Sequence, residues 1–507
     1  MSHLPALPIL LPLFTAAVLL LAERRGIAPQ RAVSATGLAL LLAAAMALAA
    51  RVDGGIPLVY LVGDWPARLG IALVADRLGA LMVLVTVLLA VPCLLHACGG
   101  GWDRRVPHFH ALFQLQLAGL SGAFLTGDLF NLFVFFEVLL IASYGLLLGG
   151  GRGARMRAGL HYIAFNITAS TLFLIALGLL YGMTGTLNMA EMALRVAALP
   201  AGDVPLVRAA AGLLLVVFCA KAALLPLHLW LPQTYARAPA AVAALFAVMT
   251  KVGVYAVLRV YALVFGTQAG PLAGWAWDWL LPAGIATLAL AALGAVAARG
   301  LRMLAGYLVI ASAATLFVAI ALATPDAVGA GLYYLVHSTF AAAALMLLAD
   351  AARRAGVTRR AAPALAYVVV AVSIAGLPPL SGFIGKALLL QAVPPQQTVA
   401  VWAAVLGTSL LMVVALARAG VRAFWEPAGR APSTADVEPA APPADPARTP
   451  WPQSLALALL VGYGVALAVA AAPVQRFARA AAVQALEPAA GIEAVRATAP
   501  RVRAPSP

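Results

Sequence analysis

Long apolar segments, separated by short polar ones, follow one another along almost the whole 507-residue chain. Each apolar segment has the roughly 18–25 residues that a helix needs to cross a bilayer core of about 30 Å. Hydropathy and helix-breaking residues predict about fourteen spans, near residues 4–22, 32–50, 77–97, 109–127, 129–149, 157–182, 207–230, 239–265, 274–298, 302–323, 328–349, 362–391, 398–421 and 452–472. The predicted fold class is therefore an all-α polytopic membrane protein, in which the first segment is a span and not a removed signal peptide.

Two of the predicted spans contain helix breakers. Pro226 and Pro232 lie in KAALLPLHLWLP, and Pro378 and Pro379 lie in LPPLSGFIGK. Proline removes a helical hydrogen bond, and unwound backbone at membrane depth is tolerated only beside protein or water. Interrupted helices in both halves of a transporter point to an ion path near the midplane. We therefore expect two inverted five-helix repeats, each with one interrupted helix.

The positions of these features predict a division of the chain into six parts. They are N-terminal helices in residues 1–108, a first repeat in 109–265, a second repeat in 266–424, a flexible cytoplasmic loop in 425–451, a last span in 452–473 and a largely disordered tail in 474–507.

Composition and charge agree with a membrane location. The chain is 64% hydrophobic and 10% charged, with a mean hydropathy of +0.98, whereas soluble proteins are about 25% charged. The net charge is +15. The basic residues form no stripe with interleaved aromatic residues, so a nucleic-acid partner is not expected. Most arginines fall in alternate loops, and the positive-inside rule then places both termini on the outer side of the membrane. Cys93, Cys98 and Cys219 predict neither a disulfide framework nor a metal site.

A few titratable residues lie inside the apolar segments, where a charge costs about 2.5–3.5 kcal/mol on insertion scales. Glu137 is the acidic residue predicted near the middle of a span, and the chain's three lysines all lie in apolar segments, at Lys221, Lys251 and Lys386. Two histidines, His228 and His337, lie in similar surroundings. These six residues are the candidate functional site.

Two interpretations of these residues stay open. They could be inert buried ion pairs that hold helices together, although one acid cannot neutralise three lysines. Alternatively they form a proton relay, because burial makes the charged lysine costly and a neighbouring carboxylate opposes loss of its proton. Lysine suits such a relay better than arginine, which effectively never deprotonates.

Three segments closely resemble the D subunit of Mrp-type (Pha or Mnh) monovalent cation/proton antiporters, and more distantly the antiporter-like subunits of respiratory complex I. They are LTGDLFNLFVFFEVLLIASYGLLL, KAALLPLHLWLPQTYARAPAAVAALFAVMTKVGVYAVLRVY and IAGLPPLSGFIGKALLLQA. The resemblance extends over about residues 4–425. It implies a proton-translocating subunit of a multisubunit Na⁺(K⁺)/H⁺ antiporter in a bacterial inner membrane, with other antiporter subunits as partners and without a cofactor.

The resemblance also implies roles for the six residues. Glu137 on the fifth helix would pair with Lys221 on the broken seventh, and Lys251, His337 and Lys386 would extend the path through helices eight, eleven and twelve. His228 would lie near the cytoplasmic part of the path. The chain departs from many relatives by lacking a further lysine shortly after His337, where it has AAAALMLLAD.

Two other functions stay open at this point. One is an antiporter-like proton-pumping subunit of a complex I-like NADH:quinone oxidoreductase or a membrane-bound hydrogenase, and the other is a membrane scaffold that carries no ions. The scaffold is disfavoured by Glu137 and the three lysines. The sequence contains no GxGxxG before a helix and no Walker A motif, so we expect a secondary transporter subunit and not an enzyme.

Overall fold

The computed structural model describes residues 3–354, 361–425 and 451–500. The predicted loop of residues 425–451 lies almost wholly outside the described residues. The helices are α1 (Leu7–Leu21), α2 (Ile27–Val52), α3 (Arg77–Gly99), α4 (Phe109–Leu125), α5 (Leu129–Leu148), α6 (Ala154–Thr184), α7 (Met189–Ala197), α8 (Val204–Lys221), α9 (Trp230–Arg237), α10 (Ala240–Leu245), α11 (Met249–Leu263), α12 (Trp275–Ala297), α13 (Leu301–Ala321), α14 (Pro325–Arg354), α15 (Ala361–Ala375), α16 (Ser381–Gln391), α17 (Thr398–Gly420), α18 (Trp451–Val469), α19 (Ala471–Leu486) and α20 (Ala489–Ala497).

The apolar helices confirm the predicted class of membrane protein. Within the described residues, 11 helical segments are long and apolar enough to cross a bilayer, and the shorter apolar helices are α1, α4 and α15. Each of the predicted spans coincides with one of these segments or with a broken pair of helices. The pattern of apolar segments was therefore sufficient to locate the spans.

Both predicted interruptions are present. α8 ends at Lys221 and helix resumes at Trp230 in α9, while α15 ends at Ala375 and helix resumes at Ser381 in α16. In the first break, the Leu225 amide donates to Thr287 Oγ1 at 3.0 Å and the Trp230 indole donates to the Ala220 carbonyl at 3.2 Å. Side chains thus satisfy backbone groups that the helix no longer pairs. The inverted relation of the two repeats stays a prediction.

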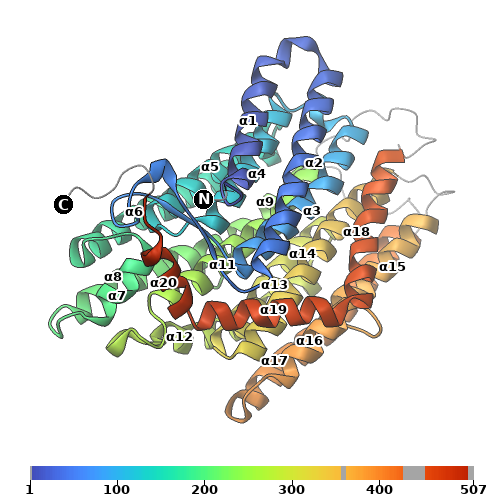
Figure 1. Ribbon diagram of the computed structural model, residues 1–507. Coiled ribbons are helices and arrows are strands. Elements are labelled where there is room, and N and C mark those ends of the chain that lie inside the picture. The colour runs from blue at the N-terminus through green and yellow to red at the C-terminus, as the bar shows by residue number, and fades with distance from the viewer. Residues whose placement is uncertain (1–2, 355–360, 426–450, 501–507) are drawn as a thin grey trace.

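The helices form one bundle, in which α11, α13 and α14 are central and α6, α17 and α18 are peripheral (Figure 1). The apolar part of α10–α11 is 100% buried and that of α14 is 94% buried, against 33% for α17 and 22% for α18. Peripheral helices expose large apolar side chains such as Leu410 and Ile167, as a lipid-facing surface requires. The titratable residues on α11 and α14 are therefore in the interior of the protein.

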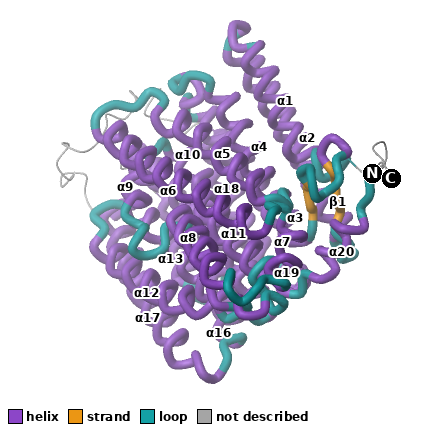
Figure 2. The backbone as a smooth tube through the Cα atoms, turned by 90° about the vertical axis from the view of Figure 1, so that its left-hand side faces the viewer, coloured by secondary structure: helices purple, strands orange, loops and turns teal. Residues whose placement is uncertain are grey.

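Two small elements outside the spans were not predicted. A hairpin pairs β1 (Leu58–Leu61) with β2 (Ala72–Ala75) in antiparallel fashion, and Figure 2 shows it at one edge of the molecule, beside α20. The short helix α7 begins where the Asn188 side chain accepts hydrogen bonds from the amides of Ala190 and Glu191. The all-α prediction thus missed a two-stranded sheet in the connection between α2 and α3.

The C-terminal segment corrects one prediction. Residues 474–507 were expected to be largely disordered, but α19 and α20 continue the ordered chain to Ala497. α19 lies across the bundle (Figure 1) and packs against α3, α11 and α14. Its buried positions are Ala478, Ala481, Ala482 and Ala485, so a stripe of small residues provides the packing face. The prediction was wrong because Ala-rich, Arg-containing sequence has the composition of a flexible tail as well as of an amphipathic helix.

Candidate functional site

Glu137 lies near the middle of α5, within the span. α5 begins at a cap in which the Asp128 carboxylate accepts from the Asn131 amide at 2.8 Å, so the start of the helix is well defined. The Glu137 side chain is half-buried. Its Oε1 accepts a hydrogen bond from the hydroxyl of Ser170 on α6. Glu137 therefore has a hydroxyl as its immediate partner.

Lys221 is the last residue of α8 and is almost fully buried. Its Nζ donates to Ser170 Oγ at 3.3 Å and lies 5.2 Å from the centre of the Phe136 ring. Ser170 thus joins Lys221 to Glu137. The position also favours a cation, because the carbonyl end of a helix carries partial negative charge and an aromatic face attracts an ammonium group.

Lys251 is on α11 and is fully buried. Its Nζ donates to Ser312 Oγ on α13 at 2.8 Å, and Ser312 Oγ in turn donates to the Val309 carbonyl at 2.8 Å. In the part of the chain that the structure describes, no carboxylate pairs with Lys251. A charged lysine here is stabilised by a hydroxyl dipole alone, so its charged state is costly.

His337 on α14 and Lys386 on α16 continue the row in the second half. His337 Nδ1 lies 3.0 Å from Ser381 Oγ, at the start of α16. The His337 ring is buried and lies within electrostatic reach of both Lys251 and Lys386. A cavity of about 20 Å³ adjoins it, lined by residues of α14, α15 and α18 that include Ser373 and Gly464. That volume is sufficient for about one water molecule.

Lys386 is held by the second helix break. Its Nζ donates to the carbonyls of Ile374 at 3.2 Å and Ala375 at 2.9 Å, and to Ser409 Oγ on α17 at 2.9 Å. Ile374 and Ala375 end α15, and the last carbonyls of a helix have no intrahelical donor. The break therefore creates the acceptors that hold this lysine, and the side chain is half-buried.

His228 is separate from these contacts. It lies in the nonhelical segment between α8 and α9 and is buried. Its Nδ1 has no hydrogen-bond partner among the residues that the structure describes. The structure thus connects Glu137 with Lys221 through Ser170 and joins His337 to Ser381 at the second break, but among the described residues no direct bond joins His228 to any of these groups.

The serines are the residues that sequence analysis missed. Each connected titratable group contacts a serine hydroxyl; the four serines are Ser170, Ser312, Ser381 and Ser409. A hydroxyl is both donor and acceptor, so it can relay a hydrogen bond between two groups. The available signal was the presence of serine inside apolar segments, but serine is common in membrane helices, where it often bonds to its own backbone.

Buried ion pairs at the ends of helices were also missed. Asp76, at the start of α3, accepts from Arg259 Nη1 at 2.5 Å and Nη2 at 2.7 Å. Burial alone would raise the pKa of Asp76, but Arg259 lowers it below its usual value. Asp350, at the end of α14, pairs with Arg302 at 3.4 Å and Arg353 at 3.1 Å. The pairs Asp76–Arg259 and Asp350–Arg302 join different helices outside the row of lysines, as ion pairs that hold helices together do, whereas Arg353 lies on α14 together with Asp350.

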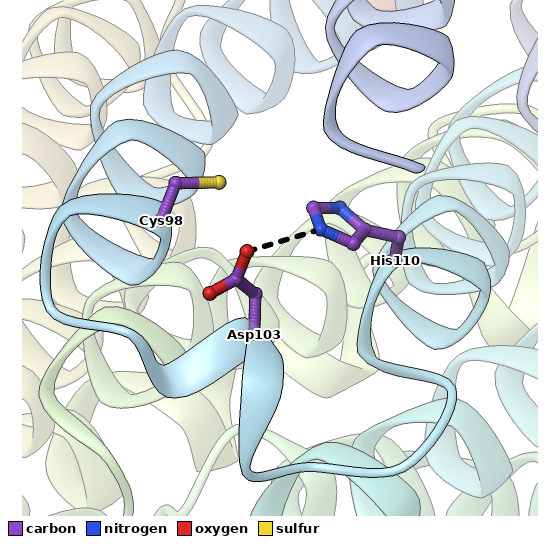
Figure 3. A group of neighbouring side chains, drawn as sticks. All are labelled: Cys98, Asp103 and His110. Carbon is purple, nitrogen blue, oxygen red and sulfur yellow. Dashed lines mark hydrogen bonds and ion pairs between the residues drawn. The ribbon is translucent and has the colours of Figure 1, made fainter. Parts of the chain in front are cut away.

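A further group of side chains lies apart from the row. Cys98, Asp103 and His110 gather where α3 turns into α4 (Figure 3). Sequence analysis assigned no metal site to the cysteines, because they form no paired CxxC pattern.

Comparison with known proteins identifies the family. Residues 126–412 match the family described as NADH:quinone oxidoreductase/Mrp antiporter, transmembrane. The chain belongs to this family. The matched segment contains all six candidate residues and both helix breaks.

Individual relatives align with most or nearly all of the chain. The D subunit of a probable K⁺/H⁺ antiporter of Rhizobium meliloti (strain 1021) is 39% identical, over 99% of this chain and 98% of the relative. The D subunit of a Na⁺/H⁺ antiporter of Alkalihalophilus pseudofirmus (strain ATCC BAA-2126 / JCM 17055 / OF4) is 36% identical, over 84% and 87%. A chain in the structure of the Mrp complex from Dietzia sp. DQ12-45-1b superimposes with a TM-score of 0.86 at 30% identity, covering 98% of this chain and 100% of that one.

Proposed function

We propose that this chain is the proton-translocating subunit of a multisubunit Na⁺(K⁺)/H⁺ antiporter, and that protons move along Glu137, Lys221, Lys251, His337 and Lys386. The observation that carries the proposal is the Ser170 hydroxyl, which donates to Glu137 and accepts from Lys221. It couples the charge of a carboxylate to the proton on a buried lysine without direct contact between them.

The relay follows from the cost of buried charge. While Glu137 is ionised, it favours the charged form of Lys221; once Glu137 is protonated, that support is lost and the buried ammonium tends to release its proton. Lys251 and His337 are buried without a carboxylate partner in the described chain, so neither retains a proton strongly. Lys386 is held by helix-end carbonyls and is half-buried, which suits a terminal station near the second break.

The chain would act within a larger assembly in the membrane. Its partners would be other Mrp-type subunits in a bacterial inner membrane, since the relatives are named as antiporter subunits and the similar structure is an Mrp complex. Both termini would lie on the outer side, which labelling of a cysteine added at the N-terminus of a cysteine-free variant would test. His228, in the first break, would serve the cytoplasmic part of the path through bound water.

The decisive experiment uses the native assembly in liposomes, with cation-dependent proton flux as the readout. Glu137→Gln removes the charge but preserves the shape, and we expect flux to fall below about one tenth of the parental value. Glu191→Gln on α7 is the control, because Glu191 pairs with Arg195 at 3.3 Å outside the row and its loss is expected to leave flux unchanged. Parental flux in Glu137→Gln, at equal assembly, would disprove the relay.

A second candidate is favoured by the family itself, whose description includes NADH:quinone oxidoreductase. In that case a distant redox reaction would drive the same relay. Mass spectrometry of the purified native assembly separates the two: small antiporter subunits support the first function, whereas iron–sulfur and quinone-site subunits would support the second.

A further inference from the structure

Three potential metal ligands of different chemistry converge at one end of the bundle, away from the lysines. Cys98 is in the last turn of α3, Asp103 is in the short helical turn Trp102–Arg104, and His110 is in the first turn of α4. Their thiol, carboxylate and imidazole ligand atoms all lie within 4.8 Å of one another. Figure 3 shows the Cys98 sulfur and the His110 ring on the same side of Asp103.

The histidine in this cluster makes weak hydrogen-bonding contacts with the described residues. The side chains of Asp103 and His110 are fully buried, and the contact between His110 Nε2 and Asp103 Oδ2 is 3.4 Å long. His110 Nδ1 has no hydrogen-bond partner among the residues that the structure describes. Buried polar groups of folded proteins are nearly always paired. A metal ion at Nε2 would replace the long contact with Asp103 by a short bond, and Nδ1, on the other side of the ring, would keep its present surroundings.

Arg31 of α2 already binds the Asp103 carboxylate, so a cation at this site would have to share that carboxylate with a positively charged side chain. Arg31 Nε and Nη2 donate to the two oxygens of Asp103 at 2.6 and 2.9 Å, and Nη2 also donates to the Cys98 carbonyl at 2.9 Å. A carboxylate has about four lone-pair positions, so two remain after Arg31 has bound. Carboxylates that ligate metals are commonly held by such outer hydrogen bonds. Arg31 is therefore a positioning residue.

The Asp103 carboxylate already forms an ion pair with Arg31 at 2.6 Å, so it is present as an anionic ligand. The Cys98 thiol has to lose its proton when a metal binds, as in other thiolate sites.

We propose that Cys98, Asp103 and His110 form a binding site for a thiophilic divalent metal ion of the Zn²⁺ class, with a fourth position open to water. Sulfur and imidazole ligands select Zn²⁺ or Co²⁺, whereas Na⁺, K⁺ and Mg²⁺ prefer oxygen. The site is therefore distinct from the path of any transported cation. Bound metal would tie the end of α3 to the start of α4.

Geometry and access are both compatible with this site. Zn–S bonds of about 2.3 Å and Zn–N bonds of about 2.0 Å place ligand atoms roughly 3–4 Å apart, so the cluster has to contract by about 1 Å. Cys98 is only partly buried and the Arg31 side chain is 31% exposed. An ion can therefore approach from the side of Cys98 and Arg31.

Titration of the purified native assembly with Co²⁺, after removal of metal with a chelator, tests the site by absorbance. The parental protein is expected to show a near-ultraviolet thiolate-to-Co²⁺ band that Cys98→Ser lacks. His110→Ala is expected to weaken binding at least tenfold. Cys93→Ser changes the other thiol of the same helix, which is buried, and is expected to keep the band. The same band in Cys98→Ser as in the parent would overturn the proposal.

A second measurement does not depend on the folding of a ligand variant. In the assembly with Cys93→Ser and Cys219→Ser in this chain, Cys98 is the remaining thiol of the chain, and its alkylation by a maleimide is followed by mass spectrometry. We expect Zn²⁺ to slow labelling at least tenfold and Mg²⁺ to have no effect. Equal rates with and without Zn²⁺, or no labelling in either condition, contradict an accessible metal-binding thiol.

Discussion

At the scale of single residues, the row of titratable groups depends on serine hydroxyls. Lys221, Lys251 and Lys386 each donate to a serine, and Ser170 also donates to Glu137. A hydroxyl stabilises a charged lysine less than a carboxylate would. It can also form a hydrogen bond with a neutral lysine, because a hydroxyl donates as well as accepts. Serine partners therefore leave both protonation states of lysine accessible.

Ser170→Ala should lower cation-dependent proton flux about tenfold or more, because it removes the hydroxyl between Glu137 and Lys221. Thr168→Ala is the matched control on the same helix, since the exposed Thr168 hydroxyl donates only to the Ala164 carbonyl. Both variants are compared in liposomes at equal assembly. Unchanged flux in Ser170→Ala would show that the Glu137 charge acts on Lys221 without the hydroxyl.

Lys221→Arg should abolish flux although it preserves the positive charge, because arginine does not release its proton near physiological pH. The measurement is flux across pH 6–9, a range chosen to include the titration of histidine and of a destabilised buried lysine. Parental activity at any pH in this range would make Lys221 a fixed counter-ion of Glu137.

At the scale of elements, a lysine belongs to each of the two helix breaks, but the two lysines are held differently. Lys221 ends α8, and its ammonium group donates to Ser170 of α6. Lys386 reaches the carbonyls that end α15 and also donates to Ser409 of α17. Unpaired carbonyls at the end of a helix favour positive charge, so the second break itself supplies part of the polar site of its lysine.

Gly382→Ala tests the second break. A Cβ at Gly382 would lie 1.8 Å from the Ser373 carbonyl oxygen and 2.8 Å from His337 Nε2, so α16 would have to move away from both α15 and His337. We expect flux to fall at least tenfold. Gly407→Ala is the control, because a Cβ there has no neighbour within 4 Å. Equal flux in the two variants would mean that the close packing of α16 on His337 is not needed.

At the scale of the whole molecule, α19 connects parts of the bundle that are far apart in sequence. It packs against α3, α11 and α14. The Gln484 side chain accepts from the Arg77 amide at 3.1 Å and donates to the Gly55 carbonyl at 3.0 Å. The helix therefore ties the N-terminal part of the chain to the helices that carry Lys251 and His337.

Deletion from residue 471 onward should lower the melting temperature of the native assembly by several degrees, because it uncovers the faces of α3 and α14 beneath α19. Deletion of residues 501–507 alone is the control and is expected to leave melting unchanged. Differential scanning fluorimetry of the assembly in detergent measures both. A melting temperature that is unchanged by the longer deletion would show that α19 contributes nothing to stability.

The sequence alone determined the membrane class, the spans, the two helix breaks and the positions of Glu137 and the lysines. Apolar segments of bilayer length and prolines within them act locally, so their consequences can be read without knowledge of packing. Isolated charges in such segments stand out for the same reason, because each is costly in hydrocarbon.

Only the tertiary structure decided which groups meet. Ser170 joins Glu137 to Lys221 because α6 packs beside α5 and α8, and Ser312 meets Lys251 because α13 packs against α11. Serine has no sequence context that marks such a partner. The tail was misjudged for a related reason: α19 has a small apolar face that is stable only against the bundle. Contacts between distant segments depend on how helices pack, and that is a property of the whole fold.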